Sequence, residues 1–199
     1  MGGSGLGRRT LKMIPYYPSP QEIYETLMKS EGPRYKTQPE FYRSRDRALI
    51  SIIYLAGLRV SEALRLRLSQ FSILKDYVEI RAIKLSKSRV KGQPRRVQYR
   101  DARLPLKGER APLTRLVLDY ISRLKGDEKL FKFETNQRAW QIVKAYFPEW
   151  TTHWLRAFCE DYLYTAWGND LLAVADYVKV DPRTLQQYIR KRYERYPVV

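Results

Sequence analysis

Apolar residues in the first third of the chain recur at the spacing expected of helices. Residues 19–22 (Ser-Pro-Gln-Glu) combine an N-cap serine, a proline at the first helical position and a glutamate that can complete a capping box. After a loop punctuated by Pro39, residues 45–56 are apolar on most sides, which predicts a buried helix that ends at Gly57. A short helix should follow over residues 60–66.

The hydrophobic period shortens to two residues in the middle of the chain. Residues 77–83 are β-branched and nearly alternating, and residues 96–104 repeat the pattern until Pro105, so we expect an antiparallel strand pair. A short strand near residues 71–74 can join this pair. The segment between the two long strands, residues 86–95, predicts a basic hairpin tip with a Gly-x-Pro turn.

The rest of the chain returns to helical spacing. Further helices are expected over residues 113–124, 137–147 and 153–167, then one ending near Val178 and a last one opened by Asp181 and Pro182. The pattern therefore predicts an α+β domain of about eight helices, mainly α-helical, with a small three-stranded antiparallel β-sheet.

Composition then narrows the choice of partner. The 199 residues include 38 Lys and Arg against 21 Asp and Glu, a net charge of +17. Such an excess predicts a polyanionic partner, nucleic acid before an anionic membrane surface. The longest apolar stretch, residues 48–58, is too short to cross a bilayer. One Cys and one His exclude an intramolecular disulfide and a structural zinc site, so we expect no metal and a reducing, cytoplasmic compartment.

Three short features could carry chemistry. Arg59 lies at the joint between two apolar helices, with Glu62 three residues later. In the ordinary interpretation this is an exposed arginine with a local partner; in the functional one, Glu62 positions the guanidinium to grip a phosphate. His153 and Arg156 are spaced to share one helix face. Tyr188 lies on the last predicted helix, one of 16 tyrosines in the chain.

Taken together, these features resemble the tyrosine recombinase family, which includes the integrases and the Xer/Cre-type enzymes. Residues 57–64 (Gly-Leu-Arg-Val-Ser-Glu-Ala-Leu) are similar to the first box of the family, and residues 153–156 (His-Trp-Leu-Arg) to its His-x-x-Arg box. Tyr188 follows Arg156 by 32 residues, the usual spacing of the family's nucleophile. The resemblance spans about residues 18–193, and the basic hairpin makes it most like the archaeal integrases.

The resemblance implies the fold of the tyrosine recombinase catalytic domain and a set of catalytic residues. Tyr188 would attack the scissile phosphate, whose non-bridging oxygens Arg59 and Arg156 would grip. His153 would complete this shell, and Glu62 would support Arg59.

The hairpin and the turn before the last helix complete the implied site. Lys87, in Ser-Lys-Ser, is favoured as general acid, with Lys84 as the alternative. Lys179 stands where the family usually has His or Trp, nine residues before Tyr188. Basic residues of the hairpin would contact DNA phosphates: Lys84, Arg89, Lys91, Arg95 and Arg96.

The implied activity is site-specific recombination or integration of double-stranded DNA through a 3′-phosphotyrosyl link, with no metal, ATP or other cofactor. We expect a lead-in over residues 1–17 and a catalytic domain over residues 18–199, without an N-terminal core-binding domain. The chain should be a monomer in solution and a tetramer on synapsed DNA. The expected source is prokaryotic, with a virus or plasmid as a candidate carrier of the gene.

Two alternatives stay open at this point. A non-catalytic DNA-binding module with the same fold would have the same charge, because charge indicates partners rather than chemistry. A type IB topoisomerase would use the same chemistry but would rejoin the same strand, relaxing DNA instead of exchanging strands.

Overall fold

Helix α2 (Pro39–Ala56) is the centre of the fold. The computed structural model describes residues 17–85, 97–133 and 135–193. Within them, α2 packs mainly against α4 (Ala111–Ile121) and α6 (Thr152–Ala166). Every residue from Leu49 to Ala56 is at most 1% exposed, which confirms the predicted buried helix. The prediction of its start was wrong: Pro39 does not lie in the loop but in the first turn, where a missing N–H costs nothing.

The first helix, α1 (Pro20–Lys29), begins as predicted. The Ser19 hydroxyl accepts a hydrogen bond from the Glu22 backbone N–H at 3.2 Å, and the Glu22 carboxylate accepts one from the Ser19 N–H at 2.8 Å. This confirms the capping box. The helix buries Ile23 and Leu27 completely in the common core.

The sheet has three antiparallel strands in the order β1 (Phe71–Ile73), β2 (Tyr77–Lys84) and β3 (Tyr99–Pro105). Its topology confirms the prediction, although β3 begins at Tyr99 rather than residue 96. The β2–β3 register shifts between Ile80 and Ile83, where the backbone N–H of Ala82 donates to the Asp101 carboxylate at 2.8 Å. One face of β3 packs on α2 and α4.

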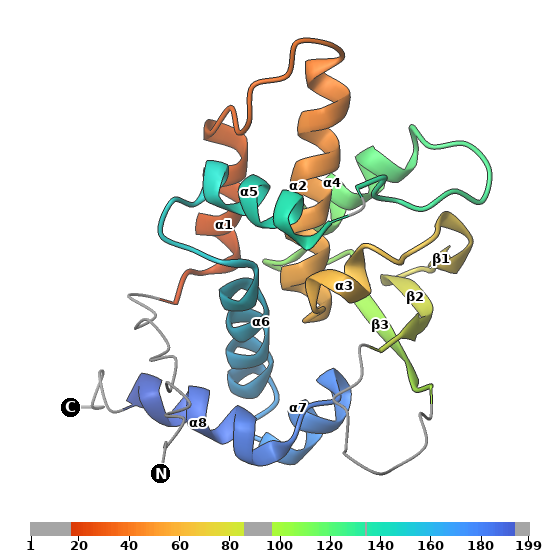
Figure 1. The fold of residues 1–199 in the computed structure, drawn as a ribbon. Coiled ribbons are helices and arrows are strands. Elements are labelled where there is room, and N and C mark those ends of the chain that lie inside the picture. The colour runs from red at the N-terminus through yellow and green to blue at the C-terminus, as the bar shows by residue number, and fades with distance from the viewer. Residues whose placement is uncertain (1–16, 86–96, 134, 194–199) are drawn as a thin grey trace, which may run out of the picture.

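The remaining helices surround this core (Figure 1). They are α3 (Val60–Ala63), the 3-10 helix η1 (Leu68–Gln70), α5 (Asn136–Tyr146), α7 (Leu171–Val178) and α8 (Pro182–Tyr193). In Figure 1, α3 lies between α6 and the sheet, whereas α7 and α8 lie at the lower end of α6. Eight α-helices in the described residues agree with the predicted number.

Two helices end earlier than predicted. Helix α3 stops at Ala63, because the chain turns to bury Leu66, whose carbonyl accepts a hydrogen bond from the Leu130 N–H at 2.9 Å. Helix α4 ends at Ile121, and tighter turns follow it up to residue 124. The early end of α3 goes with a contact to a distant segment, which local spacing does not report.

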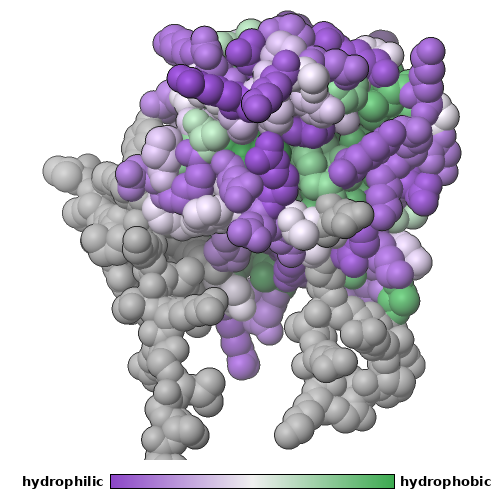
Figure 2. Space-filling view, turned by 45° about the horizontal axis from the view of Figure 1, so that its top comes forward, coloured by the Kyte–Doolittle hydropathy of each residue, from purple (hydrophilic) through white to green (hydrophobic). Residues whose placement is uncertain are grey.

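The surface is mostly hydrophilic on the face shown in Figure 2, with some apolar residues visible between the polar ones. None of the helices in the described ranges has the length and apolarity needed to cross a membrane. The same residues contain no group of three or more His, Cys, Asp or Glu side chains arranged to hold a metal ion.

Candidate active site

The site is built on the tight turn that ends α2. Gly57 adopts a left-handed conformation, with φ of +58°. A Cβ atom there would lie 3.1 Å from Val178 Cγ1 and 3.2 Å from Cys159 Sγ, so packing as well as backbone conformation favours glycine. The turn places Arg59 at the N-cap position of α3.

Two buried arginines hold the carboxyl end of α2. Arg100 Nη2 donates to the Ala56 carbonyl and, at 3.3 Å, to the Gly57 carbonyl. Arg110 Nη2 donates to the Leu55 carbonyl at 2.5 Å. Cations are favourable at a helix C-terminus, where the last carbonyls lack partners within the helix. Neither arginine was identified from the sequence, although both fix the segment that leads into Arg59.

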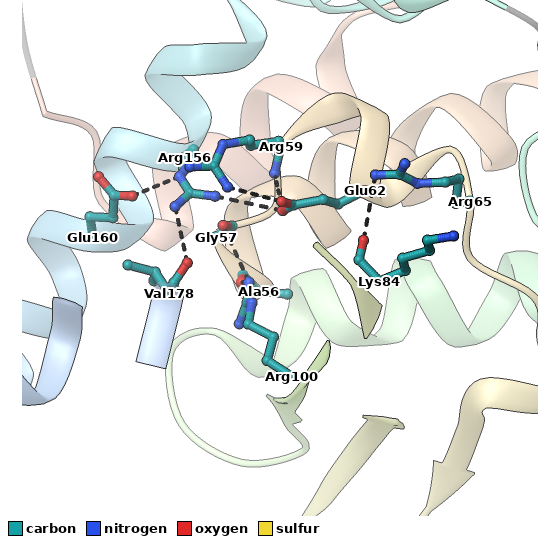
Figure 3. Close-up of polar contacts among 10 residues, drawn as sticks. All are labelled: Ala56, Gly57, Arg59, Glu62, Arg65, Lys84, Arg100, Arg156, Glu160 and Val178. Atoms are coloured by element: carbon teal, nitrogen blue, oxygen red, sulfur yellow. Dashed lines mark hydrogen bonds and ion pairs between the residues drawn. The ribbon is translucent and has the colours of Figure 1, made fainter. Parts of the chain in front are cut away.

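Glu62 is the hub of the site, as Figure 3 shows. Its carboxylate is fully buried and lies 3.0 Å from Arg59 Nη1, while accepting the Arg59 backbone N–H at 2.8 Å. Glu62 Oε2, which accepts the Arg59 backbone N–H, also forms an ion pair with Arg156 Nη1 at 3.6 Å. One buried negative charge therefore brings two guanidinium groups together against their mutual repulsion.

Arg156 and His153 line the same pocket, in agreement with the predicted shared helix face, but Arg156 is only 3% exposed whereas His153 is exposed. Its Nε donates to Glu160 Oε1 at 2.7 Å and its Nη2 to the Val178 carbonyl at 3.1 Å. Nη1 makes no hydrogen bond with the residues that the structure describes. Burial raises the pKa of Glu160, whereas Arg156 lowers it. Sequence reasoning did not identify Glu160, although its i,i+4 spacing from Arg156 was a usable signal.

The electrostatics of His153 follow from this arrangement. The imidazole is partly desolvated by the protein around it, and Arg156 and Arg59 add two nearby positive charges. Desolvation and then these charges lower the pKa of His153 below its ordinary value of 6.5. These effects disfavour the protonated imidazole relative to a free histidine, and an arriving phosphate would oppose them.

A pocket of about 210 Å³ opens over these groups. Its walls come from the starts of three helices: residues 58–61 before and in α3, Asn136 at the start of α5, and Thr152, His153 and Arg156 in α6. The lining of this pocket holds two arginines and a histidine, whereas neither Glu62 nor Glu160, the carboxylates that pair with the arginines, lines it. It is therefore suited to an anion such as a phosphodiester.

The other residues singled out from the sequence lie elsewhere. Lys179 ends α7 in a left-handed conformation, its Nζ binds Asp176 Oδ1 at 2.6 Å, and it does not line this pocket. Lys84 ends β2 and is also absent from the lining; its side chain points away from the two arginines in Figure 3. Tyr188 belongs to α8, but its side chain lies outside the described residues. The same is true of Lys87, Arg89, Lys91, Arg95 and Arg96.

A larger cavity of about 760 Å³ lies between the sheet, the start of α4 and the ends of α6 and α7. It is lined by acidic, basic and aromatic side chains, among them Glu79, Arg103, Tyr162, Trp167 and Tyr177. None of the residues in the predicted catalytic set belongs to its lining. The smaller pocket is therefore the candidate active site.

Comparison with known proteins gives one family and a fold. Residues 24–195 match the phage integrase family. The chain is similar to the XerH site-specific recombinase bound to palindromic difH substrate in a post-cleavage complex, with a TM-score of 0.67 and 21% identity over 97% of this chain and 54% of that one. The pre-cleavage complex of XerH with difH gives a TM-score of 0.64 and 21% identity, covering 94% and 53%. No curated protein matches the chain.

The present chain spans about half the length of the XerH structures. At 21% identity, this likeness establishes the helical fold with its three-stranded sheet. The family match covers most of the sequence, including both arginine motifs and the last helix. The chain therefore belongs to the phage integrase family and has the fold of a tyrosine recombinase catalytic domain.

Proposed function

We propose that this chain is the catalytic domain of a site-specific DNA recombinase that cuts and rejoins strands through a 3′-phosphotyrosyl intermediate. The observation that carries the proposal is the pair of arginines, Arg59 and Arg156, held by the buried Glu62 at the wall of one small pocket. Permanently charged donors gathered at one pocket are what a phosphoryl-transfer site requires. A mere DNA-binding surface has no need of a buried carboxylate that holds two guanidinium groups.

The proposed reaction exchanges one phosphate ester for another. The Tyr188 oxygen forms a bond to phosphorus, and the bond between phosphorus and the 5′ oxygen of the scissile phosphodiester breaks. Arg59 and Arg156 stabilise the charge that collects on the non-bridging oxygens. The phenol loses its proton as it attacks, and the 5′ oxygen gains one from a hairpin lysine, Lys87 or Lys84. Since the number of phosphate esters is unchanged, the reaction needs no ATP.

His153 and Lys179 are proposed to add further hydrogen-bond donors to the scissile phosphate. Desolvation and then the charges of Arg156 and Arg59 lower the pKa of His153, so binding of a phosphodiester would raise that pKa and favour an imidazolium that adds a donor to the site. Lys179 directly follows Val178, whose carbonyl holds Arg156. Its ammonium would have to exchange its contact with Asp176 for one with the phosphate.

The partner in this proposal is double-stranded DNA, in accord with the net charge of +17. We further propose a monomer in solution that becomes a tetramer on synapsed DNA, with residues 18–199 as the catalytic domain. A prokaryotic cytoplasm, an archaeal host and a virus or plasmid origin remain part of the proposal, on the resemblance of the sequence motifs alone.

The decisive test is a nicked DNA duplex that traps the covalent intermediate. The wild-type chain should form a protein–DNA adduct on a denaturing gel, and it should do so in excess EDTA without nucleotide. Tyr188→Phe should abolish the adduct and leave DNA binding intact, because only the nucleophilic oxygen is lost. Tyr193→Phe, on the same helix, is the matched control and should form the adduct.

Each other outcome has a defined meaning. DNA binding without any wild-type adduct would refute catalysis and leave a non-catalytic binding module. An adduct that persists in Tyr188→Phe would assign the nucleophile to another tyrosine. Relaxed circles without four-way junctions would indicate topoisomerase-like relaxation in place of recombination. Loss of the adduct on chelation, restored by magnesium, would overturn the metal-free mechanism.

A further inference from the structure

Asn136 is the one uncharged amide side chain in the lining of the candidate active site. It is the first residue of α5, but it is not the cap of that helix. The N-cap is Thr135, whose hydroxyl accepts the Arg138 backbone N–H at 3.4 Å. The Asn136 amide makes no hydrogen bond with the residues that the structure describes, so its donors are available to a ligand in the pocket that it lines.

A second observation indicates that the pocket holds an anion. Arg156 is 3% exposed, yet its Nη1 has no hydrogen-bond acceptor among the described residues, and the Glu62 carboxylate is 3.6 Å away. A buried charged donor without an acceptor is unfavourable and rare in folded proteins. Since Arg156 lines the same pocket as Asn136, an anionic ligand there would complete the hydrogen bonds of both side chains.

The three walls of the pocket supply different donors. Arg59 lies at the start of α3, and His153 and Arg156 lie in α6. Two of the three walls therefore already carry an arginine. A further cation on the α5 wall would repel these groups whenever the site is empty. A neutral amide provides a donor without that repulsion, and the start of an 11-residue helix adds a favourable dipole.

We propose that Asn136 is a further phosphate-binding residue of this site, donating its side-chain amide to a non-bridging oxygen of the scissile phosphodiester. The inference rests on the proposed function for the identity of the ligand. The presence of an anion site does not depend on that function, because it is inferred from Arg156 Nη1, which is buried and has no hydrogen bond with the described residues. This separation allows the two proposals to be tested apart.

Asn136→Asp and Asn136→Ala are the test variants, and Gln137→Glu is the matched control. Gln137 is the next residue of α5 and does not line the pocket, so its variant adds the same charge at the same helix end without touching the ligand. A carboxylate in the first turn favours a helix. Asn136→Asp should therefore unfold at the wild-type temperature or above it, which separates lost binding from lost folding.

The first measurement uses inorganic phosphate and needs no catalysis. The chain has a single histidine, His153, whose imidazole NMR signal reports occupancy of the pocket. We expect Asn136→Asp to weaken phosphate binding by about 10-fold, because a negative charge then faces the anion. Gln137→Glu should bind within about 2-fold of wild type.

The second measurement uses the covalent-adduct assay. Asn136→Ala should slow cleavage by about 10- to 100-fold, less than the roughly 10²- to 10³-fold known for a fully preorganised oxyanion donor, because Asn136 is exposed. Asn136→Asp should be slower still. A scissile methylphosphonate, which lacks the negative charge, should bring Asn136→Asp close to Asn136→Ala.

The outcomes separate the two proposals. If wild type forms no adduct but binds phosphate in the pocket, and Asn136→Asp binds it about 10-fold more weakly, the recombinase proposal fails while the Asn136 contact stands. If both Asn136 variants match wild type in phosphate binding and cleavage, the contact is refuted. It is equally refuted if Gln137→Glu loses as much as Asn136→Asp, since the effect would then be one of general charge.

Discussion

Glu160 offers the sharpest test of how the arginine site is held together. Its carboxylate and the Arg156 guanidinium are each 4% exposed and meet at 2.7 Å, one helical turn apart in α6. Substitution by alanine removes the closest counter-charge of Arg156 and leaves Nε without an acceptor. Arg156 would keep the hydrogen bond from Nη2 to the Val178 carbonyl at 3.1 Å and the ion pair of Nη1 with the Glu62 carboxylate at 3.6 Å.

The magnitude follows from burial rather than from the distance. Removing one partner of a buried ion pair costs about 3–5 kcal/mol, because an uncompensated charge stays behind. Glu62 still faces Arg156, so we expect about 3 kcal/mol for Glu160→Ala. For a chain of this size that lowers the melting temperature by about 6–12 °C. Glu160→Gln should lower the unfolding free energy less, because the amide oxygen can still accept a hydrogen bond from Arg156 Nε. The amide is also neutral, so it escapes the desolvation of a charge that raises the pKa of the Glu160 carboxyl.

The assay is chemical unfolding of Glu160→Ala beside a pair with the same spacing on the surface. Glu25 and Lys29 are also four residues apart and meet at 3.1 Å, but their side chains are 45% and 78% exposed. Glu25→Ala should therefore lose far less unfolding free energy than Glu160→Ala, because solvent screens an exposed pair. Equal losses for Glu160→Ala and Glu25→Ala would refute the argument that Glu160 compensates a buried charge.

Three further predictions concern the same site. The pKa of His153, measured by NMR, should lie below 6.5 without ligand and rise when phosphate binds. Because its pKa is lower in the folded chain, the unfolded chain binds the proton more tightly, and the free energy of unfolding should fall as the pH drops from 6.5 through the folded-state pKa. This loss should be absent in His153→Gln. Gly57→Ala should lose about 2–4 kcal/mol of unfolding free energy from strain and overpacking, whereas Gly126→Ala, with φ of +67° and no atom near its Cβ, should lose only the strain; equal losses would contradict the packing argument. Lys87→Ala should cut DNA roughly 10²- to 10⁴-fold more slowly and recover on a 5′-bridging phosphorothioate, whose thiolate leaves without a proton. If Lys84→Ala shows this recovery instead, Lys84 is the general acid.

Local chemistry explains what the sequence predicted correctly. The capping box of α1 and the glycine that ends α2 depend on neighbouring residues, so both can be identified from a few positions. The start of α2 could not, because proline both ends loops and opens helices, and the pattern alone does not distinguish the two at Pro39. The arginine motifs were identified because their residues are close in sequence.

The contacts that position those arginines are mostly distant in sequence. Arg100 reaches the Gly57 carbonyl from 43 residues away, and Arg110 reaches Leu55 from 55 residues away. A signal for Arg100 existed, because the alternation in β3 places it on the same buried face as Ala102 and Leu104. An arginine at an inward strand position is unusual enough to indicate a polar partner behind the sheet.

Three buried arginines near the end of α2 and the candidate active site depart from the rule that buried polar groups are hydrogen-bonded. Arg100, Arg110 and Arg156 are each no more than 6% exposed, and each keeps at least one guanidinium nitrogen without a hydrogen bond among the described residues. Arg100 and Arg110 use their charge to hold the end of α2, so their cost is offset within the fold. Arg156 alone of the three lines the candidate active site. Arg156 Nη1, which has an ion pair with Glu62 but no hydrogen bond among the described residues, therefore keeps a desolvation cost that the fold does not fully offset. Under the proposed function, a bound phosphate would offset that cost.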